Sequence, residues 1–421
     1  MAFRDIRKSR KWLSAEEVRF LLLILVILIG LFAANLTVAR SLPGGEWVFM
    51  RWSGARAFLV EKIEPYSSEI ARRTQQVAYG RIAFSSEYRY VLNDPFFIVL
   101  LYTPLALLWD FTLVRAIWML LSEIALAGII LLTFNLIEWQ PPRWLYIFLF
   151  AFGLLSQFSL TGLMTGTPAI ILAFLYLGIL LALRSFSDEL AGILLALIAY
   201  QWEVGGLFFL FILFFVITNR RWRVLGGFGM AMFVMLVVSF MVYSGWGLPY
   251  VRAVLADWLG SENITFGYIL STWFPHIRFS IGNVVAIVLG IIVFAEWVAS
   301  IHAHFRRVVW TAALSLAAAP LMGFAIFPSN HVVLIPAFIL IIALIWERWQ
   351  RRRVLYSVLV LLLVLTVPYA LYFRAVYIYD QLVLDLISVL PPIAAILGLY
   401  WMRWWVLRSP RTWFDRLGDY R

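Results

Sequence analysis

The sequence predicts an all-α polytopic membrane protein, and three observations carry this prediction. First, 63% of the 421 residues are hydrophobic and only 14% are charged, whereas soluble domains are roughly half apolar and a quarter charged. Second, apolar runs of about 20 residues, enough to cross a bilayer, recur along the chain. Third, aromatic residues make up 17% of the chain and include 20 Trp, as expected for belts at membrane interfaces. Such a composition excludes soluble enzymes, nucleic-acid-binding proteins and disordered chains.

The N-terminal region predicts an uncleaved signal anchor. A basic segment, 1–16, precedes an apolar run over 18–39 that is longer than a signal-peptide core and has no small-residue cleavage site after it. Its start is expected in the cytoplasm, so the segment 40–93 is expected outside. The apolar spacing in this segment predicts a helix that lies on the outer membrane face and ends near Pro65. A second helix is expected over 67–79.

From residue 95 onward, apolar runs follow one another almost without a pause. The segment 95–109 is short and contains Pro104, so it is either a full span or a partial one packed on protein. Arginine clusters at 220–223, 306–307 and 348–353 and the tail 407–421 all fall in the cytoplasm if 95–109 is partial. We therefore expect a single domain over 1–421 with about 12 transmembrane helices, or about 13 with 95–109, and both ends inside. The expected spans are 18–39, 111–136, 144–158, 166–184, 188–201, 203–219, 222–243, 279–301, 307–325, 330–347, 353–374 and 382–406.

The formal charge of +11 (34 Lys and Arg against 23 Asp and Glu) is attributed largely to these inner loops. The chain has no Cys and four scattered His, and it carries no nucleotide-binding or metal-binding motif. No cofactor and no metal are expected. A second external segment is expected over 244–278, with short external turns at 159–165, 201–203 and 327–331.

The external segment 40–93 contains the strongest group of reactive side chains. Glu46 follows Gly44 and Gly45, which permit a tight turn, and the basic residues Arg51 and Arg56 come next on the predicted helix. A carboxylate at the outer face suits a general base that deprotonates a hydroxyl as it attacks a sugar carbon. Nearby Arg or His donors would stabilise a leaving phosphate. The alternative is that Glu46 only caps or solvates an interfacial helix.

Several segments, taken in order, resemble glycosyltransferase family 87 of the GT-C superfamily, which includes polyprenol-phosphate-mannose-dependent mannosyltransferases. They are the signal anchor, GGEWVFMRWSGARAFLVEKIEPYSSEI, NDPFFIVLLYTPLALL, IAYQWEVGGLFFL and FPSNHVVLIPAFIL. Three positions differ from the family pattern. Glu46 stands where the family usually has Asp, Gly166–Thr167 stands where it often has Gly-Gln, and the turn at 200–203 lacks the family's Lys.

The resemblance implies a GT-C-like bundle with extracytoplasmic amphipathic helices and a set of site residues. Glu46 is the expected base, and Arg51, Arg56 and His331 are expected to hold the donor phosphate. Tyr66, Asp94, Gln201 and Glu203 complete the expected substrate-binding set. The plain alternatives are an interfacial anchor for Tyr66, a helix cap for Asp94, a connecting turn for Gln201 and Glu203, and a solvated turn for His331.

The resulting hypothesis is an inverting glycosyltransferase in the plasma membrane, with its active site on the extracytoplasmic face. It would move a sugar, mannose by resemblance, from a polyprenyl-phosphate donor to a glycan or glycolipid acceptor. Its partners would be these substrates and membrane lipids, and no nucleic acid. Two alternatives stay open: a transporter or flippase of lipid-linked glycans, and a catalytically inactive relative of the GT-C enzymes.

Overall fold

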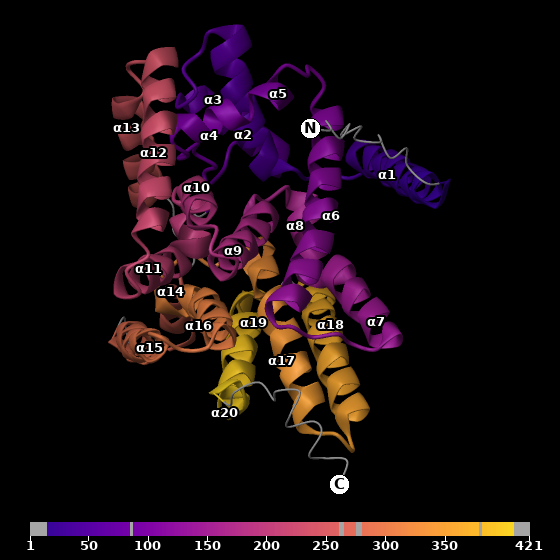
Figure 1. Cartoon of the computed structure of the whole chain (residues 1–421). Helices are drawn as coiled ribbons and strands as arrows, with labels where there is room; N and C mark the ends of the chain where they lie inside the picture. Colours follow the sequence, from indigo (N-terminus) through magenta and orange to yellow (C-terminus); the bar gives the residue numbers. More distant parts are fainter. Residues whose placement is uncertain (1–14, 85–86, 261–264, 275–279, 379–380, 408–421) are drawn as a thin grey trace, which may run out of the picture.

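The computed structural model describes residues 15–84, 87–260, 265–274, 280–378 and 381–407. All regular structure in these ranges is helical (Figure 1). Within these ranges eight helices are long and apolar enough to cross a membrane, which confirms an α-helical, multi-pass architecture. They cover Glu16–Ser41, Phe111–Leu136, Arg143–Thr165, Trp222–Val242, Ile281–Ala299, Pro328–Arg348, Arg353–Ile378 and Leu382–Trp401.

The first half of the chain contains a long anchor, four short helices and then the first part of the bundle. The helices are α1 (Ala15–Ser41), α2 (Glu46–Arg56), α3 (Ser68–Tyr79), α4 (Phe96–Leu101), α5 (Thr103–Ala106), α6 (Phe111–Leu136), α7 (Arg143–Leu155), α8 (Gln157–Thr165), α9 (Ala169–Arg184), α10 (Asp188–Ile198) and α11 (Trp202–Thr218). A π-helical turn, η1 (Ala57–Glu61), continues α2.

The second half contains the rest of the bundle. Its helices are α12 (Trp222–Val242), α13 (Gly247–Gly260), α14 (Phe266–Trp273), α15 (Ser280–Ala299), α16 (Phe305–Ala318), α17 (Ile335–Arg348), α18 (Arg353–Ile378), α19 (Gln381–Trp401) and α20 (Arg403–Leu407). Two 3₁₀ helices, η3 (Ala319–Met322) and η4 (Pro328–Leu334), lie between α16 and α17. Residues 261–264 and 275–279 of the predicted external segment 244–278 lie outside the described residues.

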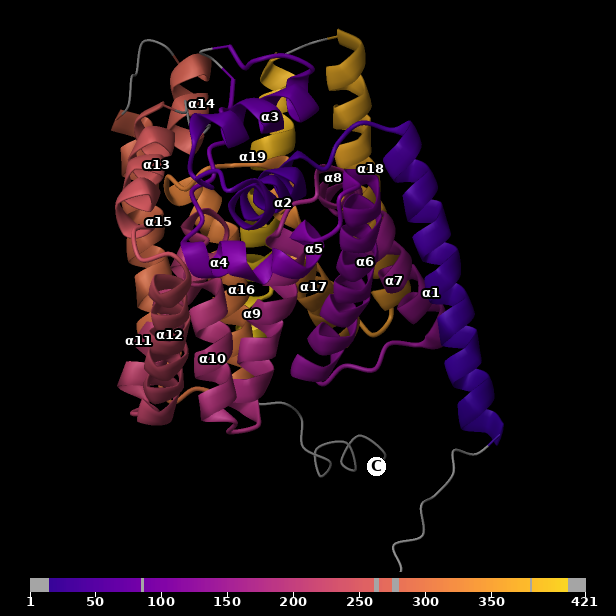
Figure 2. The same cartoon turned by 90° about the horizontal axis from the view of Figure 1, so that it is seen from above.

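Helix α17 forms the centre of the bundle. Every residue from Ile335 to Ile345 is buried, which explains why this helix is apolar on all sides. Helix α1 is the opposite case, because it lies at the edge of the bundle (Figure 2) and most of its side chains are exposed. Asn35 of α1 donates a hydrogen bond to Glu123 of α6 at 2.9 Å. This polar contact joins α1 to the bundle.

Among the described residues, fewer of the 12 expected spans form helices long enough to cross a membrane than predicted. Eight of the expected segments form long helices, while 166–184 and 203–219 form the shorter apolar helices α9 and α11. Within 188–201 and 307–325, α10 and α16 have only 11 and 14 residues. At about 1.5 Å per residue, neither of these two helices alone crosses the roughly 30 Å hydrocarbon core. Segment 95–109 is the partial one, since α4 and α5 have six and four residues.

The predicted helix in the first external segment forms, but its position differs from the prediction. Nearly all of α2 is buried, including Trp47, Arg51 and Trp52, so α2 is not an amphipathic helix on the membrane face. It packs against α3, α4, α5 and α6, and a Cβ on Gly54 would lie 2.5 Å from Leu92. The second predicted helix, over 67–79, is α3 with its start shifted by one residue.

Candidate active site

Glu46 is the first residue of α2 and follows a glycine turn. Gly44 and Gly45 have φ of 125° and 84°, values that disfavour any residue with a side chain. The Gly45 amide donates to the Met164 carbonyl at the end of α8 at 2.8 Å. The turn therefore brings the end of α1, the start of α2 and the end of α8 together. The Glu46 side chain is half-buried at this junction.

Arg115 of α6 holds this turn in place. Its buried guanidinium donates to the carbonyl of Leu42 at 2.6 Å, to that of Pro43 at 2.9 Å and to that of Met164 at 3.3 Å. Sequence reasoning missed Arg115, although a charged residue inside an apolar span is a recognised signal of function or structure.

Burial and charge set the acidity of Glu46. Burial raises the pKa of the Glu46 carboxyl from 4.5 to about 7, while a hydrogen bond from its own backbone and the positive charge of Arg115 work in the opposite direction. The helix N-terminus also favours the carboxylate. A carboxyl with a pKa near neutrality can take up a proton from a substrate and release it again at physiological pH.

Aromatic side chains border Glu46 on one side. Trp47 packs against Tyr88, Tyr90 and Phe327 with ring centroids 5.4 Å apart in each case. We call these four residues the aromatic wall. Burial raises the pKa of the Tyr90 hydroxyl, and the negative charge of Glu46 raises it further, so the two groups interact electrostatically. Tyr88 and Tyr90 were not singled out in the sequence.

The predicted turn at 159–165 is wrong, because these residues belong to helix α8, and the turn follows at Gly166. This turn and the predicted turn at 327–331 lie close to the start of α2. A Cβ on Gly166, which has φ of 70°, would lie 2.8 Å from the Val48 side chain of α2. Thr167 donates to the Asn330 side chain at 3.0 Å, and Phe327 belongs to the aromatic wall. Two segments that are far from α2 in the sequence, 164–167 and 327–330, thus lie against the start of α2.

Arg51 and Asp94 form a buried ion pair on a second face of α2. The Arg51 Nε atom lies 2.7 Å from Asp94 Oδ2, and Nη2 donates to Oδ1 at 3.1 Å. Each side chain is only 2% exposed. The Tyr66 hydroxyl donates to the Asp94 backbone carbonyl at 3.0 Å. Arg51 is therefore already neutralised, and Asp94 joins α2 to the start of α4.

Two further carboxylates lie near this pair. Asn93 donates to Asp257 of α13 at 2.9 Å, and burial raises the pKa of Asp257 to about 6. Glu203, at the start of α11, interacts electrostatically with Asp257, Arg51 and Asp94. Glu203 was predicted as a site residue, whereas Asn93 and Asp257 were not. Gln201 is half-buried next to Glu203, where it precedes the first residue of α11.

Arg56 and Trp52 cap the short helix α5. Arg56 donates to the carbonyls of Ala106 and Leu108 at 3.2 and 3.4 Å, and Trp52 Nε1 donates to those of Leu105 and Leu108 at 3.0 and 3.2 Å. The Arg56 Nε atom lies 3.9 Å from Glu61 Oε1, and the Arg56 side chain remains 22% exposed. Among Arg51, Arg56 and His331, Arg56 has the most exposed side chain.

His331 lies deeper than predicted. Its side chain is 2% exposed, and its ring packs edge-on against Phe158 at 5.9 Å. The neighbouring Asn330 reaches the Gly166–Thr167 turn instead. The structure therefore brings the segment of His331 to the candidate site but turns the imidazole into the bundle.

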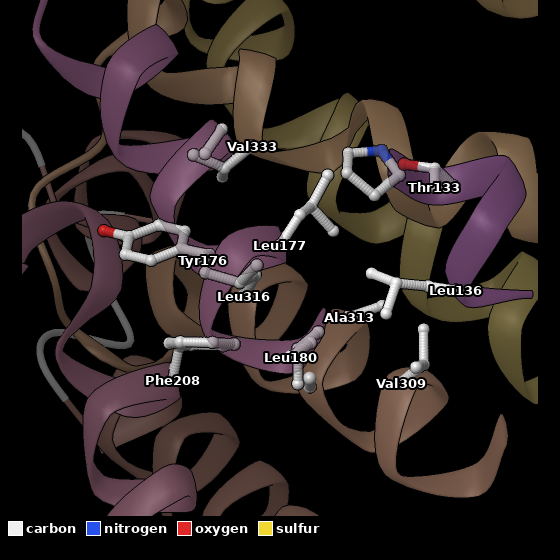
Figure 3. A pocket seen from close by; sticks show the side chains of 13 residues that line it. Thr133, Leu136, Tyr176, Leu177, Leu180, Phe208, Val309, Ala313, Leu316 and Val333 are labelled. Carbon is white, nitrogen blue, oxygen red and sulfur yellow. The ribbon is translucent and has the colours of Figure 1, made fainter. Parts of the chain in front are cut away.

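A cavity elsewhere in the bundle does not contain the predicted residues. It is lined mainly by aliphatic side chains of α6, α9 and α16, with Thr133, Tyr176 and Phe208 at its margin (Figure 3). The Tyr176 hydroxyl points towards Gly205, where a Cβ would lie 2.1 Å from it. No group of three or more His, Asp or Glu side chains suited to a metal occurs in the described part of the chain.

Comparisons with known proteins found no matching family model, no similar curated protein and no similar solved structure. The resemblance to glycosyltransferase family 87 therefore stays a prediction that rests on the sequence segments quoted above.

Proposed function

We propose that the protein is an integral-membrane glycosyltransferase with Glu46 as its general base. The donor would be a sugar linked to a polyprenyl phosphate, and the acceptor a glycan or glycolipid hydroxyl outside the cytoplasm. The observation that carries the proposal is the position of Glu46. It is half-buried where the start of α2 meets the segments 164–167 and 327–330, and burial raises its pKa to about 7. A carboxylate that only solvated a helix end would keep a pKa near its ordinary value.

The proposed reaction is a single displacement. The acceptor oxygen forms a bond to C1 of the sugar as the bond between C1 and the phosphate oxygen breaks. The acceptor proton passes to the Glu46 carboxylate, and the polyprenyl phosphate leaves with the bonding electron pair. The configuration at C1 is inverted. The apolar faces and hydroxyl groups of the aromatic wall suit a sugar ring next to Glu46.

We assign the donor phosphate to Arg56 among the predicted ligands. The Arg56 side chain is 22% exposed and its ion pair with Glu61 is long, at 3.9 Å, whereas Arg51 forms a buried 2.7 Å pair with Asp94 and His331 is buried. A charged donor close to the leaving oxygen would stabilise the charge that develops there. In this proposal Arg51, Asp94 and Tyr66 build the site, and Glu203 and Gln201 lie on its acceptor side.

The test is transfer in liposomes that contain the purified full-length protein, a radiolabelled polyprenyl-phosphate mannose and an acceptor glycan. We expect a labelled glycan with wild-type protein and a loss of about 10²- to 10⁴-fold in rate with Glu46→Gln. Glu64→Gln removes an exposed carboxylate from the same external segment and should keep full activity. Full activity of Glu46→Gln would contradict the base assignment. Movement of the lipid across the bilayer without a new glycosidic bond would favour the flippase alternative.

A further inference from the structure

The turn between α17 and α18 exposes a group of arginines. Arg348, Arg351, Arg352 and Arg353 are all exposed, and they lie within six consecutive residues at the lower edge of Figure 1. We call them the arginine turn. Across the described residues, none of the four side chains has a carboxylate within ion-pair distance or donates a hydrogen bond to the protein.

Five other arginines of the predicted inner side are paired with acids, while Arg220 is exposed and has no ion pair in the described residues. Arg306 binds Glu347 at 2.6 Å, and Glu296 binds Arg403 at 2.7 Å and Arg307 at 3.3 Å. Further pairs are Arg184–Glu138 and Arg221–Asp188. Within the described residues, these five arginines are paired with acids, whereas the four arginines of the turn have no ion pair.

Tryptophans hold two of these arginines in defined positions. The guanidinium of Arg348 lies 4.4 Å from the Trp349 ring centroid, and that of Arg353 lies 4.6 Å from the Trp346 ring centroid. Stacking engages the flat face of a guanidinium and leaves its N–H groups free at the edge. Those edge donors match the oxygens of a phosphate.

The same tryptophans place the turn at the depth of lipid headgroups. Trp346 packs against Trp144 at the start of α7, with ring centroids 5.9 Å apart. Trp349 packs against Trp401 at the end of α19 at 5.0 Å. Tryptophans at the ends of membrane helices lie at the boundary between hydrocarbon and headgroups. A phosphate held by the arginine turn would therefore belong to a lipid in the same leaflet.

We propose that the arginine turn is a binding site for anionic phospholipid headgroups. It lies at the opposite end of the bundle from the proposed active site in the predicted topology, and it does not depend on the proposed function. The positive-inside tendency alone accounts for basic residues in this loop. It does not account for guanidinium groups that are stacked on tryptophan and unpaired while their neighbours are paired.

The test measures lipid selectivity of the full-length protein in bilayers that contain spin-labelled phosphatidylglycerol or spin-labelled phosphatidylcholine. The motionally restricted fraction of each label gives the preference for the anionic lipid. The main variant is Arg348→Gln/Arg353→Gln, which removes the two stacked guanidinium groups. The matched control is Arg220→Gln/Arg223→Gln, which removes the same charge from another predicted inner loop, where both side chains are exposed and Arg223 lies 4.0 Å from Glu189. Arg348→Lys/Arg353→Lys keeps the charge and loses the planar fork.

We expect the main variant to lose roughly fivefold or more of its preference, as the surface attraction per arginine implies. The control should stay near the wild-type preference, and the lysine variant should fall between the two. Equal losses in the main variant and the control would overturn the proposal, because a general charge effect would explain them. The absence of any preference in wild-type protein, or displacement of the lipid by excess soluble glycerol phosphate, would overturn it as well.

Discussion

Two acidic residues, Glu46 at the start of α2 and Asp94 beside Arg51 of α2, have different roles because their partners differ. Asp94 lies against Arg51, with both side chains 2% exposed, so its negative charge neutralises the Arg51 guanidinium. Glu46 has no ion pair within 4.0 Å in the described residues. The positive charge that acts on its pKa is that of Arg115, which also donates to three carbonyls. The first arrangement stabilises structure, and the second leaves a carboxyl available to exchange protons.

The Arg51–Asp94 pair makes a prediction about stability. Asp94→Asn leaves a buried guanidinium without its counter-charge, which costs about 3–5 kcal/mol in comparable buried pairs. We expect a large drop in the unfolding temperature of the purified protein in detergent. Arg51→Met/Asp94→Leu removes both charges and should recover part of the loss. If Asp94→Asn melted at the wild-type temperature, the pair would not have the structural role assigned to it.

At the scale of elements, the turn before α2 determines where Glu46 lies. The turn needs two residues with positive φ, and it fits beneath Arg115 with no room for a side chain. A Cβ on Gly45 would lie 2.9 Å from the Arg115 Cδ atom and 3.1 Å from Phe111. The sequence indicates a turn here but not the arginine that covers it, because that contact joins residues about 70 positions apart.

Gly45→Ala tests this element. The added methyl group meets both an unfavourable φ and the Arg115 side chain, so we expect a loss of stability larger than the roughly 1 kcal/mol of the backbone effect alone. Gly80→Ala is the matched control, since Gly80 has φ of 69° and an added Cβ there would have no atom within 4 Å. The difference in unfolding temperature between the two variants separates the effect of the contact with Arg115 from that of backbone strain. Equal losses would mean that Arg115 does not constrain the turn.

At the scale of the whole molecule, the sequence predicts which segments form helices, but it does not predict how deeply each helix is buried. Apolar runs predicted α1, α6 and the later bundle helices, and a proline in a short run predicted the partial segment 95–109. The spacing of apolar residues shows which face of a helix is buried but not what covers the other face. For that reason α2 was expected at the membrane surface and was found inside the protein.

The candidate site shows the same limit. Glu46 and the turns around Gly166 and Phe327 were predicted, since each interrupts an apolar run. The partners of these residues lie far away in the sequence, as in the pairs Arg51–Asp94 and Asn93–Asp257, which are 43 and 164 residues apart. No local pattern encodes such pairs. This is why Arg115, Asn93 and Asp257 appear only in the folded chain.

The predicted topology can be tested by cysteine labelling, because the chain contains no Cys. Figure 2 shows α3 at one end of the bundle and the turn between α9 and α10 at the other. Ser68 and Ser185 are exposed at these two places. We expect a membrane-impermeant maleimide to label Ser68→Cys in intact cells and Ser185→Cys only after permeabilisation. The reverse pattern would put Glu46 on the cytoplasmic side.

The central claim, that Glu46 acts as a general base, is tested most directly by the pH dependence of kcat/KM for glycosyl transfer. The base works as the carboxylate, so a pKa of about 7 predicts a wild-type rate that is low in acid and rises with a midpoint near pH 7. Glu46→Gln should be slow and flat across the same range, because its amide does not titrate. A wild-type rate that does not change through this range, or a Glu46→Gln variant that keeps the same midpoint, would contradict the account.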